Sequence, residues 1–277
     1  SPALVGGYDT PGSTQGVIVA GDHAYLADGS YGLQVIDIAD PASPALAGGV
    51  TLAGTARRID VDGDFAYVGD FSPGLAEIDI SNPSAPVVTR TLSLPSDAWD
   101  VEIDGDHAFI AANVSGLVVA RISCAMQPVL EGVCGVGGSA QRVALDGDYA
   151  YVAAGSAGLQ VADIGDPAAP VSIGSYPTLG DCNYLAISGD YAFASASAAG
   201  IVVLDVSDPA SPALLGSYVT PEAANGIAVS GDYAFVAAGY TGLIVLNVAD
   251  PATPTLLGTC NTPTFAYDVA VAGDYAF

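Results

Sequence analysis

The chain has 277 residues, of which 51% are hydrophobic and 13% are charged, with 30 acidic residues against five arginines and a net charge of -25. This apolar content is sufficient for a large core and excludes a disordered chain. The negative charge repels phosphates, so we expect no nucleic-acid partner. Gly, Pro or Asp interrupts each apolar run within about ten residues, too short for the about 18 of a membrane helix, so we expect no membrane span.

A pentapeptide, Gly-Asp-x-Ala-aromatic, returns every 42 residues without insertion or deletion. Its seven copies begin at Gly21, Gly63, Gly105, Gly147, Gly189, Gly231 and Gly273. A constant period of this length predicts one supersecondary unit copied along the chain. We therefore expect a single domain over residues 1–277, and we expect that domain to be part of a longer chain.

Within one unit the pattern predicts four short strands. Residues 3–8 and 16–20 form the first two, and the turn at Gly21-Asp22 leads into a third at 23–27. A fourth, 33–38, follows Gly32 and ends before Asp40-Pro41. Apolar residues alternate along these segments, and Gly, Asp and Pro mark the turns. A proline precedes each copy of the first strand, which suits the outer edge of a sheet. Four-stranded antiparallel sheets of this period predict an all-β fold, the β-propeller.

The seventh unit is incomplete in these 277 residues. Residues 3–8 are predicted to be the outer strand of the last blade, and the seventh copy of the pentapeptide ends at Phe277. We expect a seven-bladed ring with six complete blades and a partial seventh, since an open sheet edge at the closure would be a pairing hazard. Rings of six or eight blades remain alternatives.

Two strings carry a family resemblance. Gly-Leu-Gln-Val-Ile-Asp-Ile-Ala-Asp-Pro at 32–41 and Gly-Ile-Val-Val-Leu-Asp-Val-Ser-Asp-Pro at 200–209 resemble the LVIVD repeat, which forms propellers in bacterial and archaeal surface proteins. The third copy departs from it at 120–125, where the Asp and the Asp-Pro pair are missing. The resemblance implies an exported or cell-surface propeller, and it supplies no catalytic motif.

The most variable phase of the repeat lies where the chain enters the inner strand, at the mouth of the central channel. Arginine offers a planar fork of donors, and Trp or Tyr offers a stacking face. We therefore predict a ligand site at the mouth. Its residues are Arg57, Arg58, Trp99, Asp100, Gln141, Arg142, Asn183, Tyr184, Tyr267 and Asp268, and Gln15 occupies the same phase. The alternative is that the arginines only pair with Asp100, Asp268 and neighbouring acids.

Metal and cofactor sites find little support. Asp60-Val61-Asp62-Gly63-Asp64 alternates carboxylates as a calcium loop does, but it lacks the EF-hand spacing. His23 and His107 occupy a phase that is aromatic elsewhere, which argues against zinc. We expect no cofactor and no metal. The four cysteines are too few for a disulfide scaffold, and we expect them to be mostly unpaired: Cys124, Cys134, Cys182 and Cys260.

Three functions remain open. The first is a non-catalytic extracellular or cell-surface module for binding, adhesion or structure, with a protein or glycan as its partner. The second is a subunit of an extracellular assembly or filament, closed by strand exchange with copies of itself at the partial blade. The third is a hydrolase or lyase at the mouth, for which Asp100 and Asp268 are a conceivable acid and base.

Overall fold

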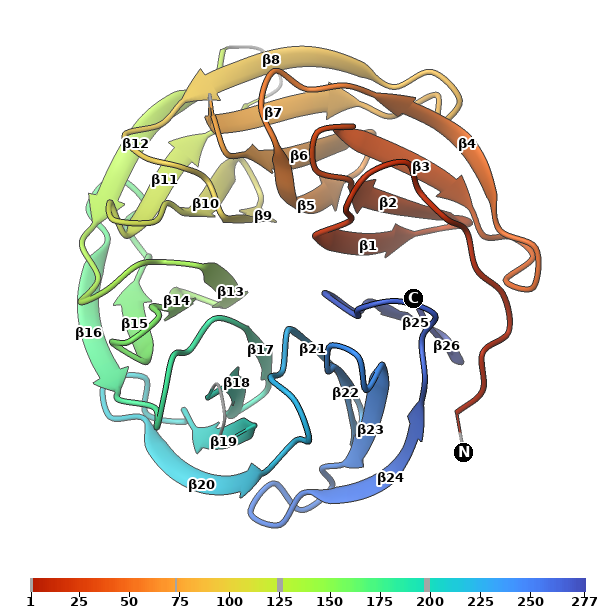
Figure 1. Ribbon diagram of the computed structural model, residues 1–277. Helices are drawn as coiled ribbons and strands as arrows, with labels where there is room; N and C mark the ends of the chain where they lie inside the picture. The colour runs from red at the N-terminus through yellow and green to blue at the C-terminus, as the bar shows by residue number, and fades with distance from the viewer. Residues whose placement is uncertain (1, 73, 124–126, 197–199) are drawn as a thin grey trace.

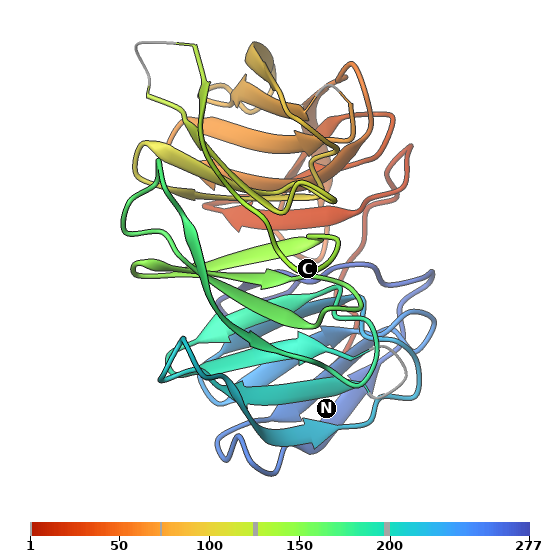
Figure 2. The same ribbon diagram turned by 90° about the vertical axis from the view of Figure 1, so that its left-hand side faces the viewer.

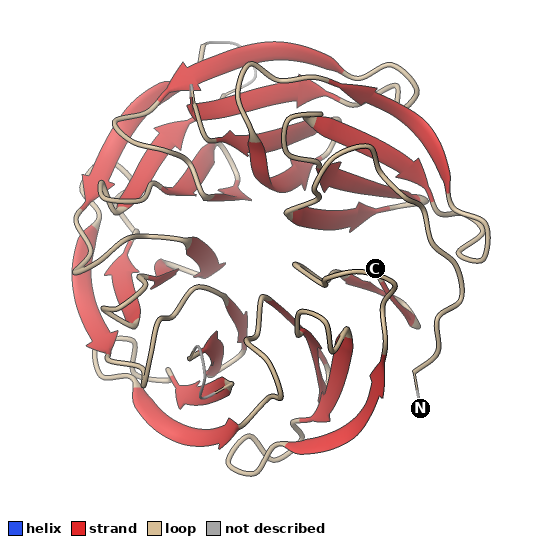
Figure 3. Cartoon of the chain, in the orientation of Figure 1, coloured by secondary structure: helices blue, strands red, loops and turns tan. Residues whose placement is uncertain are grey.

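The computed structural model describes residues 2–72, 74–123, 127–196 and 200–277. These residues form strands and loops, with no helix among them (Figure 3). Six four-stranded antiparallel sheets stand around a central axis, and a two-stranded sheet follows (Figure 1). Figure 2 shows the same ring from its side. The predicted all-β propeller of four-stranded blades is therefore confirmed. In the described part of the chain no helix could cross a membrane.

Each blade is formed by four consecutive strands, with the first nearest the axis and the fourth at the rim. Blades 1 to 3 comprise β1 (Gly16–Ala20), β2 (His23–Ala27), β3 (Leu33–Asp37), β4 (Ala45–Val50), β5 (Ala56–Asp62), β6 (Phe65–Asp70), β7 (Gly74–Asp79), β8 (Val87–Ser93), β9 (Asp100–Asp104), β10 (His107–Ala111), β11 (Leu117–Arg121) and β12 (Val129–Cys134).

Blades 4 to 6 repeat this order, and an inner hairpin then begins a seventh unit. The strands are β13 (Arg142–Asp146), β14 (Tyr149–Ala153), β15 (Leu159–Asp163), β16 (Val171–Tyr176), β17 (Leu185–Ser188), β18 (Tyr191–Ser195), β19 (Ile201–Asp205), β20 (Ala213–Tyr218), β21 (Gly226–Ser230), β22 (Tyr233–Ala237), β23 (Leu243–Asn247), β24 (Thr255–Cys260), β25 (Val271–Ala272) and β26 (Tyr275–Ala276).

The pentapeptide forms the inner hairpin turn of each blade and the core beside it. Gly21 has a φ of 58°, and a Cβ added there would meet nothing within 4 Å, so the backbone conformation is what requires glycine. The following Ala24 and Tyr25 are buried. Tyr25 packs in a cluster that joins residues of blade 1 to Ala66 and Ile78 of blade 2. The hydrophobic core therefore lies between the blades.

Four outer strands, β4, β12, β16 and β20, pack against the next blade at a glycine. The ladder between β3 and β4 shifts register between Val35 and Ile36. A Cβ on Gly48, which pairs with Val35, would lie 2.5 Å from the carbonyl oxygen of Pro83 in blade 2. Gly132, Gly174 and Gly216 meet the corresponding carbonyls of Pro167, Pro209 and Pro251. The Asp-Pro turn of one blade, or Asn82-Pro83 in blade 2, thus rests on the outer strand of the preceding one.

The prediction of a strand at residues 3–8 is wrong, because this segment has no regular secondary structure. Its position is nevertheless that of an outer strand: a Cβ on Gly6 would lie 2.2 Å from the carbonyl oxygen of Pro41, as at the glycines above. Figure 1 shows the N-terminal segment passing outside β26. Between them no third strand is present in the described chain, so the segment has no ladder partner.

Blade 2 differs from the other blades at one pair of residues between its third and fourth strands. Five complete blades pair a valine of the third strand with a glycine of the fourth, whereas blade 2 pairs Glu77 with Arg90. Glu77 is only 2% exposed, lies 3.3 Å from Arg90 and accepts a hydrogen bond from Thr89. A buried carboxylate is costly unless it is paired, so each of these substitutions requires the other.

We predict strong coupling between these two positions. Arg90→Gly should lower the free energy of unfolding by about 3 kcal/mol, because Glu77 loses its cation. Glu77→Val combined with Arg90→Gly should return the protein to within about 1 kcal/mol of the wild type, since it restores the pair of the other blades. Urea unfolding of the two single variants and the double variant measures this. Additive losses would contradict the coupling.

Candidate functional site

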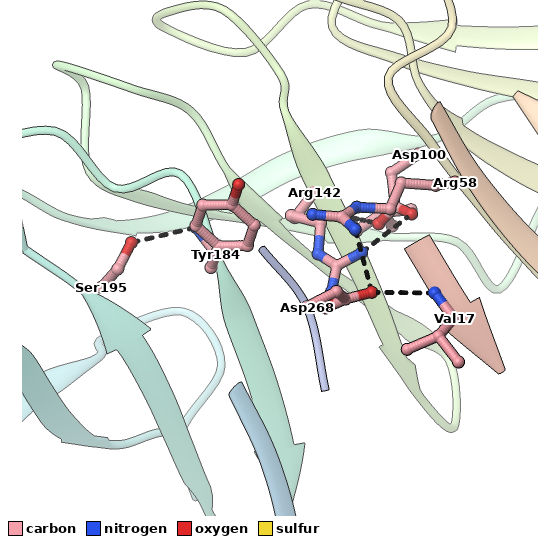
Figure 4. A network of polar contacts seen from close by, with 8 residues as sticks. Val17, Arg58, Asp100, Arg142, Tyr184, Ser195 and Asp268 are labelled. Carbon is pink, nitrogen blue, oxygen red and sulfur yellow. Dashed lines mark hydrogen bonds and ion pairs between the residues drawn. The ribbon is translucent and has the colours of Figure 1, made fainter. Parts of the chain in front are cut away.

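The channel mouth gathers the residues that begin the inner strands. Side chains two apart on a strand share a face, so one repeat position from every blade points into the channel at the same level. Arg58, Asp100, Arg142 and Asp268 meet there from four separate units of the ring (Figure 4). Gly16 and Gly226 occupy the same position in blades 1 and 6, where a Cβ would touch Arg58 and Asp268.

Two arginines and two aspartates form one network. The Nη1 atom of Arg58 lies 2.9 Å from Oδ2 of Asp268. Arg142 reaches both carboxylates, with Nη1 3.4 Å from Oδ1 of Asp100 and Nη2 3.3 Å from Oδ1 of Asp268. Both guanidinium groups also face the ring of Tyr184, at 5.3 and 5.6 Å from its centre. The network therefore crosses the channel and joins blades on its opposite sides.

The two network aspartates respond differently to their surroundings. Burial by itself would raise the pKa of Asp268, but Arg58, Arg142 and the Val17 amide outweigh it and hold that pKa below its ordinary value. At Asp100 burial prevails over the same two arginines, so its pKa is raised. Burial would lower the pKa of Arg142, yet Asp100 and Asp268 raise it above its ordinary value. Arg142 therefore stays charged.

A second level of acids lies deeper in the channel. Burial raises the pKa of Glu102 well above its ordinary value, and the neighbouring carboxylates of Asp100 and Asp60 add to this. Burial also raises the pKa of Asp60, against the effect of two backbone amides. Asp60 lies on β5, the inner strand of blade 2 that also carries Arg57. Glu102 lies on β9, the inner strand of blade 3. The deeper channel thus favours protonated carboxyl groups more than an exposed surface does.

The channel carboxylates also connect neighbouring blades through backbone amides. Asp60 accepts a 2.7 Å hydrogen bond from the amide of Ile103, in the next blade. Asp100 accepts a 3.0 Å bond from the amide of Val143. Asp268, at the same repeat phase as Asp100, accepts a 3.2 Å bond from the amide of Val17 in blade 1. The Asp60 carboxylate of the calcium-like sequence is therefore engaged in blade packing.

The part of the chain that the structure describes contains no group of three His, Cys, Asp or Glu side chains that could hold a metal ion.

A small cavity of about 40 Å³ opens at the mouth. Four polar atoms of its lining side chains are buried and make no hydrogen bond among the described residues: Nε of Arg57, Nη1 of Arg58, which forms the ion pair with Asp268, Nε1 of Trp99 and Oδ1 of Asn183. The cavity is lined by Gln15, Arg57, Arg58, Trp99, Gln141, Arg142, Asn183 and Tyr184. Such a volume holds about three water molecules. These polar atoms lie within the wall of the cavity and have almost no accessible surface of their own.

Arg57 is held between two aromatic rings. The inner ladder of blade 2 shifts register between Ala56 and Arg58, which makes Arg57 the extra residue of a bulge. Its guanidinium carbon lies 5.0 Å from the centre of Phe71 and 4.6 Å from that of Trp99. No carboxylate among the described residues is within ion-pair distance of it, unlike Arg58 and Arg142. The aromatic clamp fixes a cation whose charge the mouth does not neutralise locally.

Most of the predicted mouth residues are brought together. Seven of them line the cavity, while Asp100 and Asp268 lie in the adjoining network. Tyr267 lies apart from the cavity lining, 39% exposed and packed against Phe265 at 4.6 Å. The expectation that the arginines pair with Asp100 and Asp268 holds for Arg58 and Arg142 and fails for Arg57, because the bulge places that side chain in the clamp.

Two residues of the site were missed by sequence reasoning. Phe71 stands where the repeat has Gly29, Gly155 and Gly239, so a bulky aromatic in a glycine position is the signal that could have revealed it. Ser195 replaces an alanine of the second strand, and its hydroxyl accepts the amides of Asn183 and Tyr184, both at 3.0 Å. These two hydrogen bonds hold the chain where it enters β17.

The described cysteine thiols are unpaired: those of Cys134 and Cys182 are buried and that of Cys260 is partly exposed. Cys124 lies outside the described residues. Burial raises the pKa of the Cys182 thiol to about 12, which leaves it unreactive at neutral pH.

Radial four-stranded blades around a polar channel define the chain as a β-propeller. The LVIVD repeat model matches it six times, at residues 11–51, 53–92, 95–135, 137–178, 179–220 and 222–262. The chain therefore belongs to the LVIVD repeat family. Comparison with curated proteins gives no match.

Solved structures show the same fold at low sequence identity. A functionally unknown protein from Desulfotomaculum acetoxidans has a TM-score of 0.76 and 14% identity, over 91% of this chain and 86% of that one. The computationally designed Ika8 protein has a TM-score of 0.74 and 12% identity, over 99% and 82%. The RRP9 WD40 repeats have a TM-score of 0.73 and 11% identity, over 95% and 84%. These similarities concern the fold alone.

Asp268→Asn should lower the free energy of unfolding by about 3–5 kcal/mol at pH 7, because two arginines lose a buried partner. Since the pKa of Asp268 is lower in the folded protein, its stabilising effect is complete above the unfolded value of about 3.9 and is lost as the pH falls through the folded value. Urea unfolding at pH 7 and pH 3 should show this difference shrinking. Asp274→Asn, at an exposed aspartate of the same hairpin, is the control, and equal losses in both variants would contradict the role of the network.

Proposed function

We propose that this chain is a non-catalytic binding module whose ligand site is the channel mouth. The observation that carries this is the cavity of about 40 Å³ at the mouth, whose lining combines three arginines with Trp99 and Tyr184. Guanidinium groups offer planar sets of donors and aromatic rings offer stacking faces, so an opening that gathers both is suited to a bound polar molecule.

The pKa values of Asp100 and Asp268 are shifted in opposite directions, as an acid and a base require, but the contacts of both carboxylates favour a packing role. An acid and base pair needs one carboxyl group that gives up a proton and another that accepts it. Asp100 and Asp268 are both held by Arg142, and each accepts a backbone amide from the next blade. Their carboxylates serve the packing of the ring, which supports binding rather than turnover.

An exported or cell-surface location is part of the proposal. It is supported by the net charge of -25, which keeps a surface soluble, and by what the LVIVD resemblance implies. The buried thiols of Cys134 and Cys182 are compatible with an oxidising environment, because a buried protonated thiol reacts slowly.

The ring that best fits these contacts has seven blades. Asp268 binds the amide of Val17 as Asp100, four repeats earlier, binds that of Val143, so the partial unit meets blade 1 as one neighbour meets the next. Gly6 lies against Pro41 as Gly48 lies against Pro83. The N-terminal segment therefore takes the outer position of the seventh blade, and the hairpin β25–β26 takes the inner two.

The mouth can be tested with its own reporter, since Trp99 is the only tryptophan of the chain. Sugars, amino acids and short peptides are titrated into ¹⁵N-labelled protein, and the indole Hε1 resonance is followed. A ligand of the mouth should shift this resonance, and Arg57→Gln should weaken its binding about tenfold.

Arg121→Gln, at an exposed arginine of β11, is the matched control and should bind as the wild type does. Binding that leaves the Trp99 resonance unmoved, or that both variants weaken equally, would contradict a site at the mouth. Turnover of a bound compound that is lost in Asp100→Asn would contradict the non-catalytic assignment.

A second candidate, an assembly subunit, is favoured by the space beside β26. A cavity of about 550 Å³ lies between blade 6 and the hairpin, and its lining includes Tyr233, Phe235, Val271 and Tyr275. The strand edge of β26 has no partner on its outer side among the described strands. A strand from another copy of this chain, with the sequence of a third strand, would pair with the free edge of β26 and continue the ladder.

A synthetic peptide with the sequence of residues 242–249, the third strand of blade 6, tests this candidate. At a free peptide concentration of 100 times the Kd, the peptide should raise the free energy of unfolding by about 2.7 kcal/mol, and Tm should rise with it. The control is the same peptide with proline in place of Val245, at the centre of the strand. Proline has no N–H group, so it cannot complete the ladder. Equal effects of the two peptides, or none, would contradict strand acceptance.

A further inference from the structure

One tripeptide of the chain matches the acceptor sequence for N-linked glycosylation. Asn113-Val114-Ser115 is an Asn-x-Ser sequence whose middle residue is not proline. The other five asparagines do not qualify. Asn82 is followed by Pro83, which blocks acceptance. A residue other than Ser or Thr stands two places after each of the remaining four, which are Asn183, Asn225, Asn247 and Asn261. The sequence therefore offers one acceptor, in blade 3.

The tripeptide lies in the turn between β10 and β11, on the face of the ring that carries the mouth. β10 ends at Ala111, which pairs with Asp100 at the mouth, so the chain leaves the blade at that level. The amide of Ser115 donates to the carbonyl of Ala112 and closes the turn. Val114, at its tip, is 79% exposed. A glycan is bulky and requires a surface acceptor, and this turn meets that condition.

The side chain of Asn113 is oriented so that its reacting atom is free. The hydroxyl group of Ser139 donates to Oδ1 of Asn113, which holds one end of the carboxamide. The other end, Nδ2, makes no hydrogen bond to the described residues, and unlike Nε1 of Trp99 it is not buried. Nδ2 is the atom to which an N-linked sugar is attached. A glycan there would replace contacts with water and break no contact within the described chain.

The conformation of the turn explains Asn113 but not the whole tripeptide. Asn113 has a φ of 46°, and asparagine is among the residues that most readily adopt a positive φ in place of glycine. The same repeat position is held, at φ between 55° and 59°, by Gly29, Gly155 and Gly239. The hydroxyl group of Ser115 has no hydrogen-bond partner among the described residues. Its position is held in other blades by Tyr31, Ala157 and Thr241. The turn therefore places no demand on a serine there, whereas an acceptor sequence requires one.

We propose that Asn113 is an N-glycosylation site and carries a glycan on the mouth face of the exported protein. This inference rests on the exported or cell-surface location proposed above, because N-linked acceptors are modified in secreted chains. The donor is a sugar carried on a lipid diphosphate, and a transferase joins the two. Nδ2 forms a bond to C1 of the sugar and gives up one proton. The bond between C1 and the diphosphate oxygen breaks, and the diphosphate leaves with the electron pair.

Peptide mapping of the protein isolated from its native source tests this inference. Trypsin cleaves after Arg90 and Arg121, so residues 91–121 form one peptide that contains Asn113. We expect this peptide to carry the added mass of a glycan, and electron-transfer fragmentation should assign that mass to Asn113. The peptide of residues 59–90 contains Asn82 and is the internal control. It should carry no glycan, because Pro83 blocks its acceptor sequence.

Three substitutions, produced in the same host, separate glycosylation from the turn. Asn113→Gly introduces the residue of the other blades, and Ser115→Ala removes only a hydroxyl group without a partner. Each should lose the glycan completely and unfold in urea as the deglycosylated wild type does. Ser115→Thr preserves the acceptor sequence and should keep the glycan. Intact-mass measurement of the purified variants reports the loss or retention.

The inference and the proposals on which it depends can fail separately. Unmodified Asn113 in exported protein would overturn the glycosylation site and leave the location standing. A glycan that persists in Ser115→Ala, or that lies on another residue while Asn113 is free, would also overturn it. Protein found only in the cytoplasm would overturn both the location and the site. Ligand binding at the mouth is read separately, from the Trp99 resonance.

Discussion

Ring closure is the constraint on which the rest of the structure depends. When identical units are arranged around an axis, each repeat position from every blade reaches the channel at the same level. Positions that face the neighbouring blade must stay small or apolar, as the Ala24 and Tyr25 phases do, because they fill the core between two sheets. Positions that face the axis are free of this requirement. Chemical variety therefore accumulates at the mouth, around Arg57 and Trp99.

Electrostatics at the axis follow from the same arrangement. Arg58, Asp100, Arg142 and Asp268 come from parts of the chain far apart in sequence, yet burial and mutual distance make them one network. Buried charges are costly unless they are paired, so removal of any one of these four would leave an uncompensated charge and destabilise the ring. Arg57 is excluded from the pairing by its bulge and its aromatic clamp.

Most of the fold was predictable because its signals are local and repeated. Two-residue turns, alternating apolar positions and the proline phase predicted four strands to a unit, and the strands from β1 to β24 follow that pattern. The segment at 3–8 failed because strand formation depends on a partner: its position against Pro41 was implied by the period, but the ladder was not. At the mouth, the period located the residues but could not place their side chains.

The sequence by itself determined the repeat, the strand order and the level at which variable residues gather, since each follows from a fixed period and from steric rules of short range. Only the tertiary structure decided which charges neutralise one another. Arg57 and Arg58 are neighbours in sequence, yet one faces Phe71 and Trp99 while the other pairs with Asp268. That difference arises from a bulge and from distances across the channel, which depend on the closure of the ring.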